Sequence, residues 1–132
     1  MSNKSEGTRF EAKFCEMLFE QGFWVHNFAQ NSSGQPADVI AVRDGRPYLI
    51  DCKVCDNDEF PFHRIEPNQH LAMQMWSRCG NTQAWFALKL RDGSIYMMSY
   101  SLVQALSIGA SSATYSIIRF YGIEFREWVK NL

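Results

Sequence analysis

The chain lacks a long hydrophobic segment. It has 132 residues and begins with the polar stretch MSNKSEGTRFE. A transmembrane helix needs about 20 mostly apolar residues in a row, and a signal peptide needs an apolar core close to the N-terminus. The sequence offers neither pattern, so we expect a cytoplasmic protein.

The chain also lacks an excess of charge of one sign. Lys and Arg number 13, Asp and Glu number 14, and the net charge is −1. A general nucleic-acid binder is strongly basic, so any contact with DNA would come from local patches. Metal-binding carboxylates lower the net charge of a nuclease. The charge balance therefore counts against a nuclease but is compatible with one.

Cysteine is scarce and does not complete a zinc site. The four cysteines are Cys15, Cys52, Cys55 and Cys79. Only one C-x-x-C spacing occurs, and the three histidines are scattered, whereas structural zinc takes four Cys or His ligands. Without a secretory signal we expect reduced thiols rather than disulfides.

What the chain does contain is a hairpin pattern between residues 38 and 53. Two apolar runs, Val39–Val42 and Tyr48–Ile50, flank the turn-forming pair Asp44-Gly45. Apolar runs on either side of an Asp-Gly pair are typical of a β-hairpin with a tight turn. We therefore predict two paired strands here.

Charged residues stand at the open end of this predicted hairpin. Asp38 opens the first strand, and Asp51 and Lys53 close the second. Because side chains in a strand alternate between faces, Asp51 and Lys53 share one face and Cys52 points to the other. Pairing about the turn then brings both carboxylates and the ammonium group together.

Two carboxylates at one point suit a hard divalent cation such as Mg²⁺, which binds oxygen ligands and keeps several waters. A lysine beside them can hold a water that attacks phosphorus, or neutralise the charge that develops on the phosphate. This pattern predicts metal-assisted phosphodiester hydrolysis. The alternative is a surface hairpin whose polar ends are merely solvated.

Other patterns predict helices and strands around this hairpin. We expect a helix over Thr8–Gln21, a strand over Phe23–Phe28, an irregular substrate-facing loop over Val54–Arg64, a helix from Pro67 to about Cys79, a hairpin of Gln83–Leu90 with Ser94–Tyr100, and a helix over Leu102–Ile108 capped by Ser101. The tail leaves open a strand over Ser116–Phe120 or a helix over Glu124–Lys130. Interleaved helices and strands predict one α/β domain over residues 1–132, with a mixed sheet flanked by helices.

The order of these motifs resembles the PD-(D/E)xK nucleases. It comprises Glu11 in the first helix, Ser33-Gly34-x-Pro36-Ala37-Asp38, Tyr48-Leu49-Ile50-Asp51-Cys52-Lys53, and Gln69 in a later helix. Within these nucleases it is most similar to the Holliday junction resolvases of the archaeal Hjc and bacterial RecU types. The segment Phe60-Pro61-Phe62 is closer to RecU, and the Ser-Gly loop is closer to the archaeal type.

The resemblance implies a restriction-endonuclease-like core and a homodimer that cuts two strands of four-way DNA with Mg²⁺ or Mn²⁺. It implies that Asp38, Asp51 and the Cys52 backbone carbonyl bind metal. Glu11 would contact a metal-bound water or a second ion. It also implies a phage or bacterial source for a protein that acts in DNA recombination and repair.

In the same comparison, Lys53 would orient the water and Gln69 would support the site. Two positions depart from the pattern: Ala37 replaces the proline of the motif, which supplies no ligand, and Asp51 stands where these resolvases usually have Glu. The candidates for DNA contact are Lys4, Arg9, Lys13, Ser33, His63 and Arg64.

Two alternatives remain open from the sequence. One is a nuclease of the same fold with a different DNA substrate, of a restriction or repair type. The other is a non-catalytic module that binds DNA or protein on the nuclease fold. Trp76, Trp85 and Phe120 are candidates for a dimer interface, or equally for the core.

Overall fold

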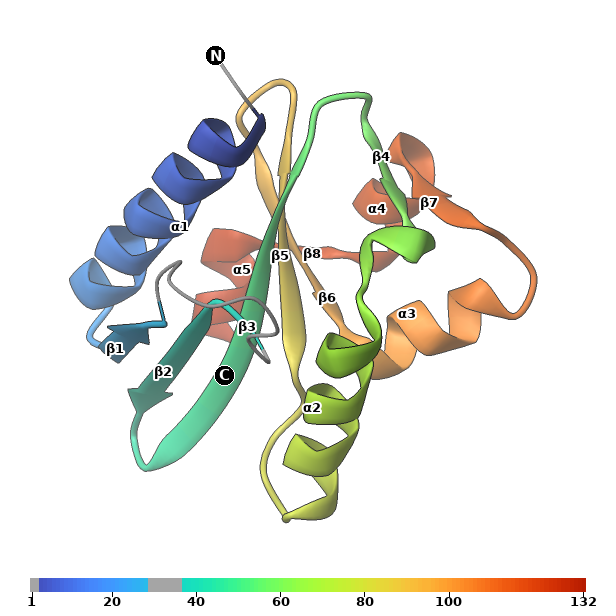
Figure 1. Cartoon of the computed structure of the whole chain (residues 1–132). Coiled ribbons are helices and arrows are strands. Elements are labelled where there is room, and N and C mark those ends of the chain that lie inside the picture. The colour runs from blue at the N-terminus through green and yellow to red at the C-terminus, as the bar shows by residue number, and fades with distance from the viewer. Residues whose placement is uncertain (1–2, 29–36) are drawn as a thin grey trace.

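The protein is built on a mixed β-sheet with helices on both faces (Figure 1). The computed structural model describes residues 3–28 and 37–132, with side chains from residue 6 onward. In spatial order the strands of the main sheet are β1 (Trp24–Asn27), β2 (Val39–Arg43), β3 (Arg46–Cys55), β5 (Trp85–Leu90), β6 (Ile95–Ser99) and β8 (Ile123–Glu124). Strands β3 and β5 are parallel, and the other neighbours are antiparallel.

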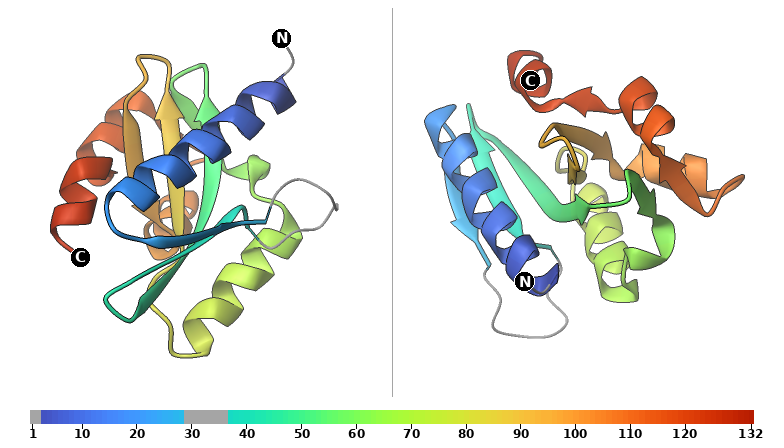
Figure 2. Two further views of the ribbon diagram at one scale, coloured as in Figure 1. Left: turned by 90° about the vertical axis from the view of Figure 1, so that its left-hand side faces the viewer. Right: turned by 90° about the horizontal axis from the view of Figure 1, so that it is seen from above.

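The helices form two layers. They are α1 (Asn3–Glu20), α2 (Pro67–Arg78), α3 (Tyr100–Ser107), α4 (Tyr115–Tyr121) and α5 (Phe125–Lys130), with a short 3₁₀ helix η1 (Phe62–Arg64) before α2. Helices α1 and α5 pack on one face of the sheet, and α2, α3 and α4 on the other (Figure 2). The predicted α/β class with a mixed sheet flanked by helices is confirmed.

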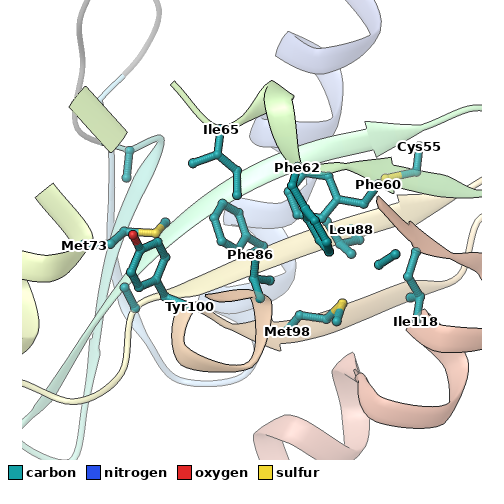
Figure 3. Close-up of a cluster of buried hydrophobic side chains, with 14 of the residues drawn as sticks. Cys55, Phe60, Phe62, Ile65, Met73, Phe86, Leu88, Met98, Tyr100 and Ile118 are labelled. Carbon is teal, nitrogen blue, oxygen red and sulfur yellow. The ribbon is translucent and has the colours of Figure 1, made fainter. Parts of the chain in front are cut away.

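The layer of α2, α3 and α4 encloses an aromatic core (Figure 3). Phe60 and Phe86 are fully buried there, with ring centroids 5.2 Å apart. Phe60 belongs to β4 (Glu59–Pro61), which pairs with β7 (Ser112–Thr114) in a second, two-stranded sheet. The predicted irregular loop over residues 54–64 is therefore wrong in part, because β3 continues to Cys55 and β4 and η1 follow.

Helix α1 begins five residues earlier than the sequence predicted. Its buried residues Phe10, Phe14 and Leu18 recur at intervals of four, as an amphipathic helix requires. The residues before Phe10 are polar and give no periodic signal, so the pattern alone could not locate the first turns. Gly22 ends the helix with φ +88°, a conformation that glycine adopts without a steric penalty.

The central hairpin forms as predicted. Asp44 and Gly45 both have positive φ, 53° and 76°, as a type I′ turn requires. The register pairs Val39 with Ile50, and the Asp38 N–H donates to the Ile50 carbonyl at 3.2 Å. Asp38 therefore lies directly beside the segment of β3 that carries Asp51.

Two predictions for the C-terminal third need correction. Helix α3 begins at Tyr100 because Ser99, not Ser101, caps it: the Leu102 N–H donates to Ser99 Oγ at 3.2 Å. The strand over residues 116–120 is wrong, since this apolar stretch belongs to α4, whose cap is Thr114. The helix predicted near the end of the chain is confirmed as α5. No helix in the described part of the chain has the length and apolar character to span a membrane.

Candidate active site

Asp38 immediately precedes β2 and is held by the backbone of the neighbouring strand β3. The Cys52 N–H donates to Asp38 Oδ2 at 2.8 Å. An N–H donor to a carboxylate makes a strong, charge-assisted bond. The hairpin register thus sets both the position and the orientation of this carboxylate beside β3.

Asp51 is fully buried in the middle of β3. Its Oδ1 accepts a hydrogen bond from Gln69 Nε2 at 3.1 Å. Its Oδ2 lies 3.0 Å from Lys53 Nζ, close enough for an ion pair. This oxygen nevertheless has no hydrogen bond with suitable geometry among the described residues. A buried carboxylate oxygen without a hydrogen bond is costly and is rare outside functional sites.

Gln69 connects the start of α2 to both charged groups of β3. It is the third residue of the helix, and its Oε1 accepts from the Glu66 N–H at 3.1 Å, as in a capping box. The same oxygen accepts from Lys53 Nζ at 3.4 Å. Lys53 Nζ also donates to the Arg64 carbonyl at 3.3 Å. Three elements, β3, η1 and α2, therefore hold the lysine in place.

The five residues predicted to be catalytic line one cavity of about 540 Å³; they are Glu11, Asp38, Asp51, Lys53 and Gln69. Glu11 enters it from α1, half-buried. The sequence interpretation did not anticipate Glu6, Asp56 and Glu59, three further acids that line the same cavity. The continuation of β3 past Lys53 and the return of the chain through β4 place two of them there, and no local pattern signals that path.

The carboxylates of this cavity hold protons more tightly than ordinary ones. Burial, then the charge of Asp38, raises the pKa of Asp51 to about 8, although Lys53 opposes the shift. Burial also raises the pKa of Asp38 in spite of the Cys52 N–H, and burial followed by the charge of Asp51 raises the pKa of Glu11. A group of buried acids that repel each other attracts a cation.

The donor set fits a hard divalent cation that keeps most of its waters. Within residues 6–28 and 37–132, no three Cys, His, Asp or Glu side chains are grouped closely enough to enclose a metal ion. Mg²⁺ is commonly held by only one or two carboxylates together with waters. Asp38 and the unbonded Oδ2 of Asp51 supply that pair. The Cys52 side chain lies in the core on the α1 side, and burial raises the pKa of its thiol, so a thiolate ligand is not available.

The predicted DNA-contact residues do not gather at this cavity. Arg64 lines it, but its Nη1 donates to the Val54 carbonyl at 2.8 Å and holds η1 against β3. His63 is exposed at a separate depression beside β4. Arg9 and Lys13 line a different cleft. Ser33 and the Lys4 side chain lie outside the described residues.

Comparison with known proteins identifies the family. A model of the archaeal Holliday junction resolvase (Hjc) family matches residues 2–132. Among solved structures, Hjc of Archaeoglobus fulgidus, a Holliday junction resolvase from an archaeal hyperthermophile, is 22% identical, covers 93% of this chain and 99% of its own, and superimposes with a TM-score of 0.72. This likeness confirms the restriction-endonuclease-like fold. A search of curated proteins gave no match. Since the family model spans nearly all residues, the chain belongs to the archaeal Holliday junction resolvase family, a family of nucleases.

Proposed function

We propose that this protein is a divalent-metal-dependent endonuclease that hydrolyses phosphodiester bonds in four-way DNA junctions, with Mg²⁺ or Mn²⁺ as cofactor. The observation that carries the proposal is the buried Asp51, which has one oxygen without a hydrogen bond and lies beside both Lys53 and Asp38. Such a group lowers the stability of the folded protein, so its presence supports a functional role.

In this proposal Asp38 and Asp51 hold the cation, and the Cys52 backbone carbonyl is a third ligand. Glu11, which enters the cavity from α1 beside Asp38, holds a cation-bound water or a second ion. The bound ion supplies Lewis-acid stabilisation of the scissile phosphate and lowers the pKa of a water. The hydrogen bond from the Cys52 N–H keeps Asp38 oriented before the ion arrives, so little reorganisation is needed.

Lys53 is proposed to orient the attacking water or to neutralise charge as phosphorus becomes five-coordinate. Its ammonium group is 3.0 Å from Asp51 Oδ2, and the Arg64 carbonyl and Gln69 Oε1 fix it from the other side. A lysine held by two neutral acceptors and the Asp51 carboxyl group points in a fixed direction. Gln69 acts on the reaction through Asp51 and Lys53 and is a positioning residue.

The test compares cleavage of a labelled four-way junction and a matched linear duplex, with Mg²⁺, with Mn²⁺ and with a chelator. We expect paired, symmetric nicks in the junction that disappear in the chelator and in Asp51→Asn and Lys53→Met. Asp44→Asn, a change in the exposed turn of the same hairpin, is the matched control and retains cleavage. Full activity in both site variants would contradict the proposed site. Cleavage of the duplex alone would indicate a restriction- or repair-type nuclease, and binding without any cut would indicate a non-catalytic module.

Symmetric cleavage of a two-fold junction calls for a two-fold enzyme, so we propose a homodimer. Of the three aromatic residues considered for the interface, Trp76 and Trp85 are partly buried against the core clusters, whereas Phe120 in α4 is 78% exposed. Tyr121 and Ile123 next to it are also exposed. Sedimentation at micromolar concentration tests the dimer, and a purely monomeric species would count against it. We propose that the protein acts in the cytoplasm, where it has access to chromosomal DNA.

A further inference from the structure

A second cleft lies beside α1, distinct from the catalytic cavity. It has a volume of about 570 Å³, and Phe10 and Leu90 contribute apolar surface to it. Four cationic side chains line it, Arg9 and Lys13 from α1 and Lys89 and Arg91 from the end of β5 and the turn that follows. All four are exposed. We call this feature the basic cleft.

Helix α1 separates the basic cleft from the catalytic cavity. At about 100° per residue, Arg9 and Lys13 lie one turn apart on the same side of the helix, and Glu11 lies roughly 160° away from each. This explains why these two cations do not reach the catalytic cavity, which Glu11 lines.

The cavity and the basic cleft nevertheless meet at one end of the molecule. Glu6, Val54 and Asp56 line both of them. The first turns of α1, the turn after β3 and the β5–β6 turn lie together at the top of Figure 1. A strand of DNA that leaves the catalytic cavity at this end therefore reaches the basic cleft without crossing the body of the protein.

The two hollows differ in charge. The catalytic cavity is rich in carboxylates, whereas the basic cleft has four cations against the two acids Glu6 and Asp56. Two ion pairs of these cations lie at the surface: Lys13 lies 3.7 Å from the exposed Glu16, and Arg91 Nε lies 3.8 Å from Oδ2 of the half-buried Asp58. Surface ion pairs contribute little to stability, so Lys13 and Arg91 can exchange a carboxylate for a phosphate at small cost.

We propose that the basic cleft binds the phosphate backbone of one duplex arm of the DNA, away from the phosphate that is cut. Lys89 at the end of β5 and Arg91 in the turn that follows contact the backbone from one side, and Arg9 and Lys13 of α1 contact it from the other. This inference rests on the proposed function, because it takes DNA as the substrate. The basic cleft gives the protein a positive surface for the DNA backbone, which neither the net charge of −1 nor the acidic catalytic cavity provides.

The test measures equilibrium binding of a four-way junction in a chelator, where no cleavage occurs, over a range of salt concentrations. We expect Lys89→Glu/Arg91→Glu to weaken binding at least about tenfold near 100 mM salt, and to reduce the slope of log affinity against log salt by about 1.8, which corresponds to two lost phosphate contacts. The matched control is Arg46→Glu/Arg78→Glu, which leaves the slope unchanged. These two exposed arginines are the first residue of β3 and the last residue of α2, and those ends of the two elements lie at the bottom of Figure 1.

Arg91 also donates from Nε to the Asp56 carbonyl at 2.9 Å, so its replacement could loosen the turn. Lys13→Glu/Lys89→Glu repeats the test without disturbing that hydrogen bond, and circular dichroism verifies the fold of each variant. A wild-type slope in both cleft variants, or an equal loss in the control, would overturn the inference. Metal-dependent cleavage by the wild-type chain is a separate test, which decides the proposed function. If junction binding depends on the basic cleft but no cleavage occurs, the proposed nuclease activity is refuted and the assignment of the basic cleft stands.

Discussion

Replacement of Asp51 by asparagine is expected to stabilise the metal-free protein while it abolishes cleavage. The side chain keeps its size, and its Oδ1 can still accept from Gln69 Nε2. In the folded protein the pKa of Asp51 is about 8, against an ordinary value of 3.8. At pH 7 the unfolded chain therefore ionises this group and the folded chain does not, which costs the folded state about 4 kcal/mol at 1.36 kcal/mol per pKa unit.

The gain in the variant is smaller than this limit. Because Oδ1 accepts from Gln69, the new amide nitrogen faces the Lys53 ammonium group, and the two groups are both donors. We expect Asp51→Asn to raise the free energy of unfolding by about 2 kcal/mol at pH 7, a large share of a total of roughly 5–15 kcal/mol. The sign of the pH dependence follows from the raised pKa. Wild-type stability due to this group is fully present below about pH 4 and is lost as the pH rises towards 8.

Urea unfolding in a chelator, from pH 4.5 to 9, measures this difference. The stability of Asp51→Asn minus that of the wild type should increase with pH up to about 8 and stay constant above it. Mg²⁺ at millimolar concentration should raise the stability of the wild type but not of the variant, because only the wild type retains the second carboxylate. A difference that is flat with pH, or a variant less stable than the wild type throughout, would refute the reasoning from burial.

Three further predictions concern single contacts. Gln69→Met leaves Asp51 Oδ1 without its donor and removes the acceptor of the Glu66 N–H. We therefore expect a loss of about 2–3 kcal/mol in the free energy of unfolding in urea and at least tenfold slower cleavage; a loss below roughly 0.5 kcal/mol, within the error of urea unfolding, would contradict its role. Ser99→Ala removes the cap of α3 and should cost about 1 kcal/mol, whereas Ser101→Ala should cost almost nothing; the reverse order would restore the cap predicted from sequence. Phe120→Asp should shift sedimentation towards monomer and leave the circular dichroism spectrum of the folded chain unchanged, since the ring is exposed; an unchanged dimer would place the interface elsewhere.

The sequence alone was sufficient for the centre of the fold. Alternating strand residues and the Asp44-Gly45 turn determine the register, and the register brings Asp38 beside Asp51. Such information is local, since it depends on a two-residue turn and on the period of a strand. The placement of Gln69 next to Asp51 came only from the family resemblance, because no local rule joins residues of β3 and α2.

The remainder depends on contacts between distant segments. Strands β4 and β7 have three residues each and lie some fifty positions apart, so neither gives a pattern of its own. In α4, Ile117 and Ile118 mimic a strand, and only the cap at Thr114 identifies the helix. The orientation of Arg9 and Lys13 away from Glu11, by contrast, follows from helical periodicity and was available from the sequence.

Because of the position of Gln69, the catalytic site can form only when the first turn of α2 is folded. Its side chain both closes the first turn of α2 and holds Asp51 and Lys53, so fraying of that turn and loss of the site are a single event. Local opening of α2 should therefore appear in amide exchange as one cooperative unit that includes the site residues of β3. A newly synthesised or partly unfolded chain therefore has no assembled catalytic site. It cannot cleave nearby DNA until α2 has packed against β3.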